Sequence, residues 1–269
     1  MKKLAIYGKG GIGKSTTVSN VAVALSQMGL KVMQIGCDPK ADSTITLRHG
    51  KELKTVLELV REGKSNPSLE DMVLEGYGGV LCVEAGGPTP GLGCAGRGII
   101  AALEKLESAG AYKVYQPDVV LYDVLGDVVC GGFTMPMRSG YADAVYILTS
   151  GENMAIHAAA NIAMAVENFK NRGYAELGGI ILNRRDVPRE KEKVAELAED
   201  FHTKVIGSLS HCPQVPLAEE KKKTLMEAYP ESKMAEEYRA LAARIYQACG
   251  GKLETKKSDS GAEKSQEEG

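Results

Sequence analysis

The segment Gly8–Ser15 constrains the fold of this chain more than any other stretch. It reads Gly-Lys-Gly-Gly-Ile-Gly-Lys-Ser and fits the pattern G-x-x-x-x-G-K-[ST]. A short apolar run, Lys3–Tyr7, precedes it, and a helical pattern of apolar residues begins at Lys14. Glycines let backbone N–H groups close around phosphate oxygens, and a helix N-terminus adds positive potential. The motif therefore predicts a phosphate-binding loop between a strand and a helix.

This loop predicts a set of nucleotide contacts. Lys14 is expected to reach the β- and γ-phosphates, and Ser15 to hold Mg²⁺. The other loop positions are expected to complete the site with backbone and side-chain groups, namely Gly8, Lys9, Gly10, Gly11, Ile12, Gly13 and Thr16. A glycine-rich turn without a ligand is the alternative, and the strand-loop-helix context disfavours it.

Lys9 is a second lysine inside the loop. It matches the deviant Walker motif of one class of P-loop ATPases, and resemblance to that class implies that Lys9 reaches across a dimer interface to the partner subunit's nucleotide. A solvated lysine is the alternative interpretation.

The segment Cys37–Thr44 follows a second apolar run, Val32–Gly36. Open α/β sheets bind ligands at the carboxyl ends of their strands, so two carboxylates here are expected to face the phosphates. We expect Asp38 to orient the attacking water and Asp42 to lie near Mg²⁺. The alternative is that Asp42 and the residues after it form a helix cap.

Short apolar runs alternate with helical patterns along the whole chain, which predicts one α/β domain with a doubly wound, mostly parallel sheet flanked by helices. Expected strands lie at 3–7, 32–36, 80–83, 118–122, 144–148, 177–182 and 204–208. Expected helices lie at 14–28, 55–61, 69–73, 98–106, 152–169, 189–198, 217–229 and 234–248, with a glycine-rich loop at 86–98. Residues 1–249 are expected to form the domain. Residues 250–269 contain only Leu253 and Ala262 as apolar side chains, which predicts a disordered polar tail.

The composition excludes several classes of partner. A formal charge of -2 gives no general attraction to nucleic acid or to acidic lipid. No stretch approaches the roughly 20 apolar residues of a membrane span, and no apolar signal segment opens the chain. We therefore expect a cytoplasmic protein, in which the six cysteines stay reduced and are available as metal ligands.

Cys94 and Cys130 lie among glycines, in Leu92–Gly98 and Asp127–Gly132. Glycines leave a thiolate unshielded and let backbone N–H groups point at the sulfur, which suits an iron–sulfur cluster. A cluster with four cysteine ligands then needs two copies of the chain, as a two-fold symmetric dimer provides. Buried structural thiols are the alternative for both residues, and core packing is the interpretation of Cys82.

Asp123 and Cys130 are joined by a short segment, Asp123-Val-Leu-Gly-Asp-Val-Val-Cys130. Its extended length is at most about 23 Å, and Gly126 is a candidate hinge because glycine tolerates positive φ. A phosphate-dependent movement of Asp123 is therefore expected to reach Cys130 through the chain itself.

Over most of its length the chain resembles the nitrogenase iron protein family. The resemblance is carried by Gly8–Thr16, Gly36–Thr44, Cys82–Pro88, Gly93–Gly98 and Tyr122–Gly132. It implies a homodimeric ATPase with one [4Fe–4S] cluster bridged between the subunits by Cys94 and Cys130. Such a protein docks on a catalytic metalloprotein and delivers single electrons, gated by MgATP hydrolysis.

The resemblance also assigns roles to individual residues. It implies that Asp38 and Asp123 open two nucleotide-responsive switch segments, that Lys40 and Asp42 belong to the nucleotide site, and that Asn183 contacts adenine. It places Arg97 and Arg138 on the surface that docks the partner, and Arg97 is a site at which the family can carry a regulatory ADP-ribose. A ferredoxin or flavodoxin is the implied electron donor.

Some positions depart from the nitrogenase pattern. Ser210-His-Cys-Pro213 stands where nitrogenase iron proteins usually carry Pro-Arg-Asp/Ser-Asn, and a short polar tail replaces the family's long C-terminal wrap. Residues 34–37 and 43–47 are also similar to the L subunits of light-independent protochlorophyllide reductase. The catalytic partner is accordingly either a dinitrogenase or a nitrogenase-like reductase, including those of coenzyme F430 synthesis (Ni-sirohydrochlorin diamide reductive cyclase) and of methylthio-alkane reduction.

Two other functions fit parts of the sequence. A partitioning ATPase, such as a septum-site or plasmid-segregation protein, shares the deviant Walker motif but leaves Cys94 and Cys130 without a role. A carrier that passes iron–sulfur units to other proteins uses the cysteines but needs no docking on a reductase. An anaerobic iron and sulfide assay distinguishes an iron protein from a partitioning ATPase, and a cluster-transfer assay distinguishes it from an iron–sulfur carrier.

Overall fold

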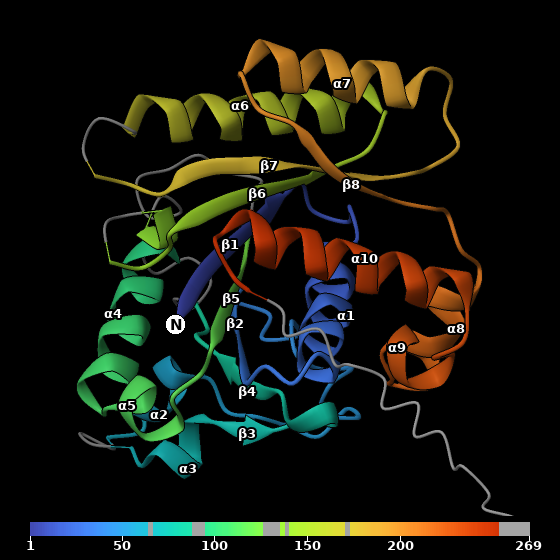
Figure 1. Ribbon diagram of the computed structural model, residues 1–269. Coiled ribbons are helices and arrows are strands. Elements are labelled where there is room, and N and C mark those ends of the chain that lie inside the picture. Colours follow the sequence, from blue (N-terminus) through green and yellow to red (C-terminus); the bar gives the residue numbers. More distant parts are fainter. Residues whose placement is uncertain (64–66, 88–94, 126–134, 138–139, 170–172, 253–269) are drawn as a thin grey trace, which may run out of the picture.

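Figure 1 shows the computed structural model of the chain, in which helices cover both faces of an open sheet. The structure describes residues 1–63, 67–87, 95–125, 135–137, 140–169 and 173–252, without the side chains of 95–97 and of Met135. Several predictions therefore fall outside the described residues. These are the cluster ligands Cys94 and Cys130, the side chain of Arg97, the docking residue Arg138, and the tail from Leu253 onward.

The described strands form an eight-stranded sheet with the order β3-β4-β2-β5-β1-β6-β7-β8. All neighbouring pairs are parallel except β3 with β4, so the expected doubly wound, mostly parallel sheet is confirmed. The bounds are β1 Lys2–Gly8, β2 Val32–Cys37, β3 Leu74–Glu75, β4 Leu81–Glu84, β5 Val119–Val124, β6 Ala144–Thr149, β7 Glu176–Asn183 and β8 Val205–Leu209. Because β1 lies between β5 and β6, the strand order reverses at β1, and ligands of such sheets bind at this point.

Helices pack on both faces of the sheet (Figure 1). They are α1 Lys14–Gln27, α2 Val56–Arg61, α3 Leu69–Met72, α4 Ala95–Ser108, α5 Ala111–Tyr115, α6 Asn153–Phe169, α7 Glu190–Asp200, α8 Gln214–Glu220, α9 Leu225–Ala228 and α10 Lys233–Ala248, with 3₁₀ turns η1 Tyr77–Gly79 and η2 Met135–Met137. Apolar side chains of α2, α4, α6 and α7 join the core on one face. Those of α1, α8, α9 and α10 join the core on the other face.

Local sequence explains where the short helices begin. At the start of α2, the Thr55 hydroxyl accepts the backbone N–H of Glu58 at 3.1 Å, and the Glu58 carboxylate accepts the backbone N–H of Thr55 at 2.8 Å. Ser68 and Asp71 form the same reciprocal pair at the start of α3. These capping boxes satisfy N–H groups that a helix end leaves unpaired, which stabilises helices too short to persist alone.

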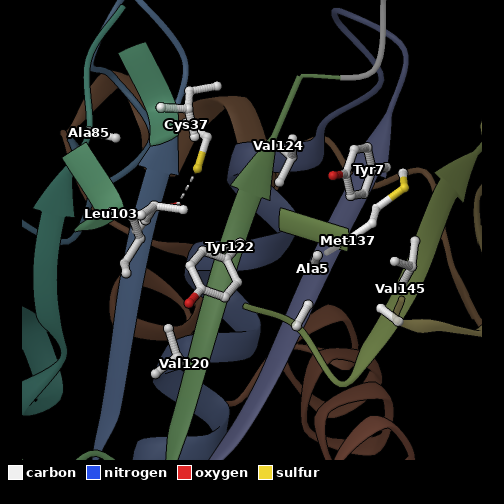
Figure 2. Close-up of a cluster of buried hydrophobic side chains, with 14 of the residues drawn as sticks. Ala5, Tyr7, Cys37, Ala85, Leu103, Val120, Tyr122, Val124, Met137 and Val145 are labelled. Atoms are coloured by element: carbon white, nitrogen blue, oxygen red, sulfur yellow. Dashed lines mark hydrogen bonds between the residues drawn. The ribbon is translucent and has the colours of Figure 1, made fainter. Parts of the chain in front are cut away.

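The two faces of the sheet differ at its carboxyl edge. Figure 2 shows the apolar face, where Tyr7, Val124 and Cys37 continue the buried cluster to the ends of their strands. Leu103 of α4 belongs to the same cluster. On the opposite face, which α1 covers, Gln34 of β2, Glu84 at the end of β4 and Asp123 near the end of β5 are polar and buried. The residues that face the end of α1 are therefore polar, whereas the rest of the core is apolar.

Three expectations about elements were wrong in detail. Helix α4 begins at Ala95, although the glycine-rich stretch predicted a loop as far as Gly98. The single helix expected at 217–229 is two helices, α8 and α9, separated by Lys222 in a left-handed conformation (φ 55°) and restarted by a Thr224 cap. The two-residue strand β3 and the helix α5 were not expected, because elements this short carry little periodic signal.

No helix within the described residues has both the length and the apolar character that a membrane crossing requires.

Candidate nucleotide site and switch segment

A cavity of about 760 Å³ opens at the carboxyl edge of the sheet, beside the loop that joins β1 to α1. Its lining comes from the loop, from the segments after β2, β5, β7 and β8, and from helices α1, α8 and α10. Its lining includes Lys9, Gly10, Gly11, Gly13, Lys14, Ser15, Thr16, Asp38, Lys40, Asp42 and Asn183, all of them predicted site residues. The structure therefore brings together the positions that the motif and the resemblance selected separately.

The glycines of the loop have the conformations that a phosphate cradle needs. Gly11 and Gly13 have φ values of 73° and 89°, which side chains rarely adopt. A Cβ at Gly13 would lie 2.8 Å from Asn183 Nδ2, whereas a Cβ at Gly11 would project into open space. Gly8 and Ile12 are buried, and the Ile12 side chain packs in the core, so these two offer only backbone groups to a ligand. The loop thus fits a polyphosphate.

Lys14 makes a buried ion pair at the start of α1. Its Nζ donates to Asp123 Oδ1 at 2.5 Å, and the two side chains are 7% and 1% exposed. The other carboxylate oxygen, Oδ2, accepts the Ser43 hydroxyl at 2.6 Å. Asp123 therefore links the lysine of the phosphate loop to the segment after β2, and a phosphate that attracts Lys14 competes directly with this carboxylate.

Asp38 and Asp42 flank the cavity on the segment after β2. The Asp38 carboxylate accepts the backbone N–H of Lys40 at 2.9 Å, and Asp42 is exposed. The alternative of a helix cap at Asp42 is wrong, because residues 43–50 form turns rather than a helix. Both residues thus line the cavity, and their roles toward Mg²⁺ and the attacking water stay predictions.

The end of the cavity near Asn183 contains residues that differ from the usual nitrogenase iron protein pattern. Asn183 Nδ2 donates to the Ile12 carbonyl at 2.8 Å, which fixes the amide beside the loop. Ser210, His211 and Cys212 line the cavity near it. Ser210 is held by the Glu237 carboxylate through its hydroxyl at 2.8 Å, and His211 Nδ1 lies 3.4 Å from Asp186 Oδ2. The substituted residues therefore line the same cavity as Asn183 and the phosphate loop, rather than lying elsewhere on the surface.

Comparison with known proteins identifies the family. A family model described as "4Fe-4S iron sulfur cluster binding proteins, NifH/frxC family" matches residues 2–260. The chain belongs to the NifH/frxC family. It is 48% identical to a nitrogenase iron protein of Methanococcus voltae over 262 residues, which cover 97% of this chain and 94% of that relative. It is 50% identical to a nitrogenase iron protein of Methanospirillum hungatei, over 91% of this chain and 88% of that relative.

Solved structures confirm the P-loop fold. The cell division ATPase MinD of Pyrococcus furiosus is similar with a TM-score of 0.70 and 20% identity, over 92% of this chain and 99% of that one. MinD of Pyrococcus horikoshii in complex with Mg-ADP gives the same TM-score at 23% identity, over 93% of this chain and 98% of that one. At these identities the similarity shows the architecture alone. Membership of the NifH/frxC family is what separates this chain from partitioning ATPases.

The cysteines that this NifH/frxC chain carries within the described residues lie in places unlike a cluster site. Cys37 and Cys82 are fully buried, which confirms the core-packing interpretation of Cys82. Burial raises the pKa of the Cys37 thiol far above its ordinary value, and the nearby Asp123 carboxylate adds to this. Cys212 and Cys249 are half-buried and separate, and within the described part of the chain no three His, Cys, Asp or Glu side chains gather as metal ligands do.

Thiol labelling tests both the buried cysteines and the cavity. Burial raises the pKa of Cys82 from 9.0 to about 12, so its reactive thiolate fraction at pH 8 falls by roughly a thousandfold. We expect a maleimide to modify Cys212 first and to leave Cys37 and Cys82 unmodified in the native protein, as peptide mass spectrometry measures. MgADP should slow labelling of Cys212, which lines the cavity, and should leave labelling of Cys249 unchanged. Equal protection of both would contradict the cavity assignment.

Sequence reasoning missed a buried polar cluster beneath the segment that follows β2. Glu84 ends β4, and its Oε1 accepts both the backbone N–H (2.8 Å) and the hydroxyl (2.6 Å) of Thr44. Arg48 and Gln34 complete the cluster, and all four residues are buried. One signal was available, since Glu84 is a carboxylate at the carboxyl end of an otherwise apolar strand, as Asp123 is.

Proposed function

We propose that this protein is an ATP-dependent one-electron reductase, a homodimeric iron protein that couples MgATP hydrolysis to electron delivery. The observation that supports it most is the combination of full-length NifH/frxC membership with the buried Lys14–Asp123 pair at the phosphate loop. The recipient is a docked catalytic metalloprotein of nitrogenase or nitrogenase-like type. The relatives named nitrogenase iron protein support a partner of this kind.

Nucleotide binding is assigned to the residues of the cavity. Lys14 binds the β- and γ-phosphates, the Ser15 hydroxyl and the Asp42 carboxylate hold Mg²⁺, and Asp38 orients the attacking water. Lys40 and Asn183 complete the site at its two ends, and Lys9 completes it from the partner subunit. The residues assigned to their own subunit's site all line the cavity, which supports their assignment, whereas the role of Lys9 rests on its match to the deviant Walker motif.

The electron carrier is a [4Fe–4S] cluster, which accepts and releases one electron when bound. We assign its ligands to Cys94 and Cys130 of each subunit. Both cysteines lie outside the described residues, but their described neighbours end at the same edge of the sheet. Cys94 immediately precedes Ala95, where α4 begins, and Cys130 follows β5, which ends at Val124. Parallel strands β4 and β5 both run toward the edge that carries the nucleotide cavity.

The Lys14–Asp123 pair is the proposed switch. Phosphates that bind Lys14 weaken its contact with Asp123, and the freed carboxylate turns toward the nucleotide site. The short segment from Asp123 to Cys130 then transmits the movement. Arg97 and Arg138 belong to the docking surface in this proposal, a ferredoxin or flavodoxin supplies the electron, and the protein works in the cytoplasm. Residues 1–249 form the functional domain, and the polar tail 250–269 is dispensable for electron delivery.

The proposal is tested by anaerobic purification. We expect a brown dimer with about four iron and four sulfide per two chains, and an electron-transfer step to the catalytic partner that requires MgATP. An iron-free ATPase under oxygen-free conditions would instead support a partitioning function. A cluster that moves to acceptor proteins without a docked reductase would support a carrier.

A further inference from the structure

Two buried carboxylates stand on either side of a glycine at the carboxyl edge of the sheet. Gly36 of β2 is in register with Asp123 of β5 on one side and with Glu84 of β4 on the other. Residues in register on neighbouring strands point to the same face. Because Gly36 has no side chain, the residues Ser43 and Thr44 lie between the two carboxylates. A Cβ at Gly36 would lie 2.6 Å from Ser43 Cβ and 2.0 Å from Glu84 Oε2.

Two consecutive residues bridge these carboxylates. The Ser43 hydroxyl donates to Asp123 Oδ2 at 2.6 Å, and the Thr44 hydroxyl donates to Glu84 Oε1 at 2.6 Å. Gln34 holds the bridge from below, since its Nε2 donates to the Ser43 carbonyl at 3.1 Å and to the Ser43 hydroxyl at 3.0 Å. With neighbouring peptide units fixed in this way, Ser43 cannot move far without pulling Thr44 and its contact to Glu84.

Burial of the Glu84 carboxylate is unfavourable for the stability of the fold. Burial is the main cause that raises its pKa, and the hydrogen bonds from Thr44 and the charge of Arg48 lower it. The Arg48 guanidinium lies 3.5 Å from Glu84 Oε1, while Glu84 Oε2 has no hydrogen-bond partner among the described residues. A buried ion pair with an unsatisfied oxygen is often less stabilising than apolar side chains of similar volume. We therefore attribute the presence of Glu84 to the residue that it holds in place, Thr44.

A second contact joins the same two segments. Gly87 lies three residues after Glu84, and a Cβ there would come within 2.4 Å of the Pro39 ring, so Pro39 packs directly on the Gly87 backbone. Between them, the Ala85 N–H donates to the Gly36 carbonyl at 2.8 Å. The segment from Asp38 to Thr44 thus contacts the end of β4 and the residues after it at two points, Thr44 with Glu84 and Pro39 with Gly87.

We propose that Glu84 is a positioning residue that couples the nucleotide-responsive pair Lys14–Asp123 to strand β4 through Ser43 and Thr44. This inference rests on the proposed function, because a nucleotide must first draw Lys14 away from Asp123. It gives the nucleotide site a second mechanical connection, toward the chain that leads from β4 to Cys94, besides the direct one from Asp123 to Cys130. When Asp123 moves, the Ser43 contact changes, and Ser43 is followed in the chain by Thr44, which contacts Glu84. Coupling between two sites requires such a shared element, whose equilibrium both sites affect.

Hydrogen exchange of the anaerobically purified dimer tests the connection. The readout is the change that MgADP or MgATP causes in exchange at 81–87 and at 98–108, because β4 and α4 contribute to the same core cluster. Thr44→Val removes the hydroxyl that donates to Glu84 and accepts from Arg48 Nε at 2.9 Å, and it keeps the backbone N–H bond to Glu84. Glu84→Gln removes the charge. We expect either variant to reduce the nucleotide-induced change at both peptides at least about threefold. The change within residues 8–20 should be retained.

A matched control separates coupling from general loss of a hydroxyl. Thr224 is also buried, and its hydroxyl accepts the backbone N–H of Glu227 at 3.2 Å, but it caps α9 and makes no contact of the bridge. Thr224→Val should leave the nucleotide-induced change at 81–87 intact. If Glu84→Gln fails to fold, Thr44→Val decides alone, since it alters no charge. Folded variants that bind nucleotide and keep the wild-type change at 81–87 and 98–108 would overturn the inference.

The proposed function fails in a different way. A wild-type protein in which no nucleotide changes exchange anywhere outside the loop would overturn the switch itself, and the coupling through Glu84 with it. A wild-type response at 81–87 that the Thr44 and Glu84 variants preserve overturns the coupling alone. As a second readout, the rate at which a chelator removes iron should rise with MgATP in the wild type and rise at least about threefold less in Thr44→Val.

Discussion

Replacing Lys14 with glutamine is expected to abolish ATP-dependent electron delivery. The lysine supplies the charge that binds the transferred phosphate, and removal of one such electrostatic contact typically lowers the rate by roughly 10²–10³-fold. It also holds Asp123, which is 1% exposed and, among the described residues, forms its ion pair with Lys14. The variant therefore loses both the chemistry and the signal that starts at Asp123. Reduction of the docked partner by stopped-flow absorbance, with and without MgATP, measures the loss.

The same substitution is expected to destabilise the fold, and this effect has to be separated from the loss of activity. Removing one partner of a buried ion pair costs about 3–5 kcal/mol, because the remaining charge stays desolvated. Asp123→Asn in the Lys14→Gln background removes that charge as well, so we expect thermal stability to recover while electron delivery stays absent. Lys113→Gln, on the exposed side of α5, is the charge-matched control and should change neither quantity. Normal ATP-dependent turnover in Lys14→Gln would contradict the assignment of the loop.

The fold was largely predictable because its signals are local. The loop Gly8–Ser15 placed a strand before it and a helix after it, and the structure has β1 and α1 there. The alternation of short apolar runs with helical patterns then predicted the parallel sheet. The start of α4 was missed for an equally local reason. Gly96 and Gly98 each disfavour a helix by about 1 kcal/mol, and tertiary packing of Ile99, Ala102 and Leu103 outweighs that preference.

In the candidate site, too, the residues with a local sequence signal were predicted and those without one were missed. The motif predicted Lys14, the carboxyl-edge rule predicted Asp38 after β2, and the resemblance selected Asn183 at the end of β7; all three line one cavity. Glu84 was missed because its partners Thr44 and Arg48 come from a different segment, and their contact depends on Gly36 leaving room between two strands. Such a site depends on sheet register, and register between distant strands is not encoded in any single stretch of the sequence.

Replacing Cys130 with serine is expected to eliminate the iron–sulfur cluster. A serine oxygen is a poor ligand for a cluster that prefers thiolate sulfur, and two-fold symmetry removes two of four ligands with one substitution. Iron content, sulfide content and the visible spectrum of the anaerobic protein should all fall to the level of the apoprotein. Cys94→Ser should do the same. Cys249→Ser is the matched control, because Cys249 is a half-buried cysteine beyond the end of α10 whose thiol contacts Tyr146, and it should keep the cluster.

Nucleotide binding should survive the loss of the cluster. The cavity is lined by the loop before α1, the segment after β2 and the residues after β7 and β8, and all of these are held by the sheet and by the Lys14–Asp123 pair. We therefore expect Cys130→Ser to bind MgADP with an affinity within about tenfold of the wild type, a difference of about 1.4 kcal/mol. If the variant instead kept a four-iron spectrum, the ligand assignment would be wrong. If it lost nucleotide binding together with the cluster, the two sites would form a single folding unit, and a separate switch between them would have no place in the mechanism.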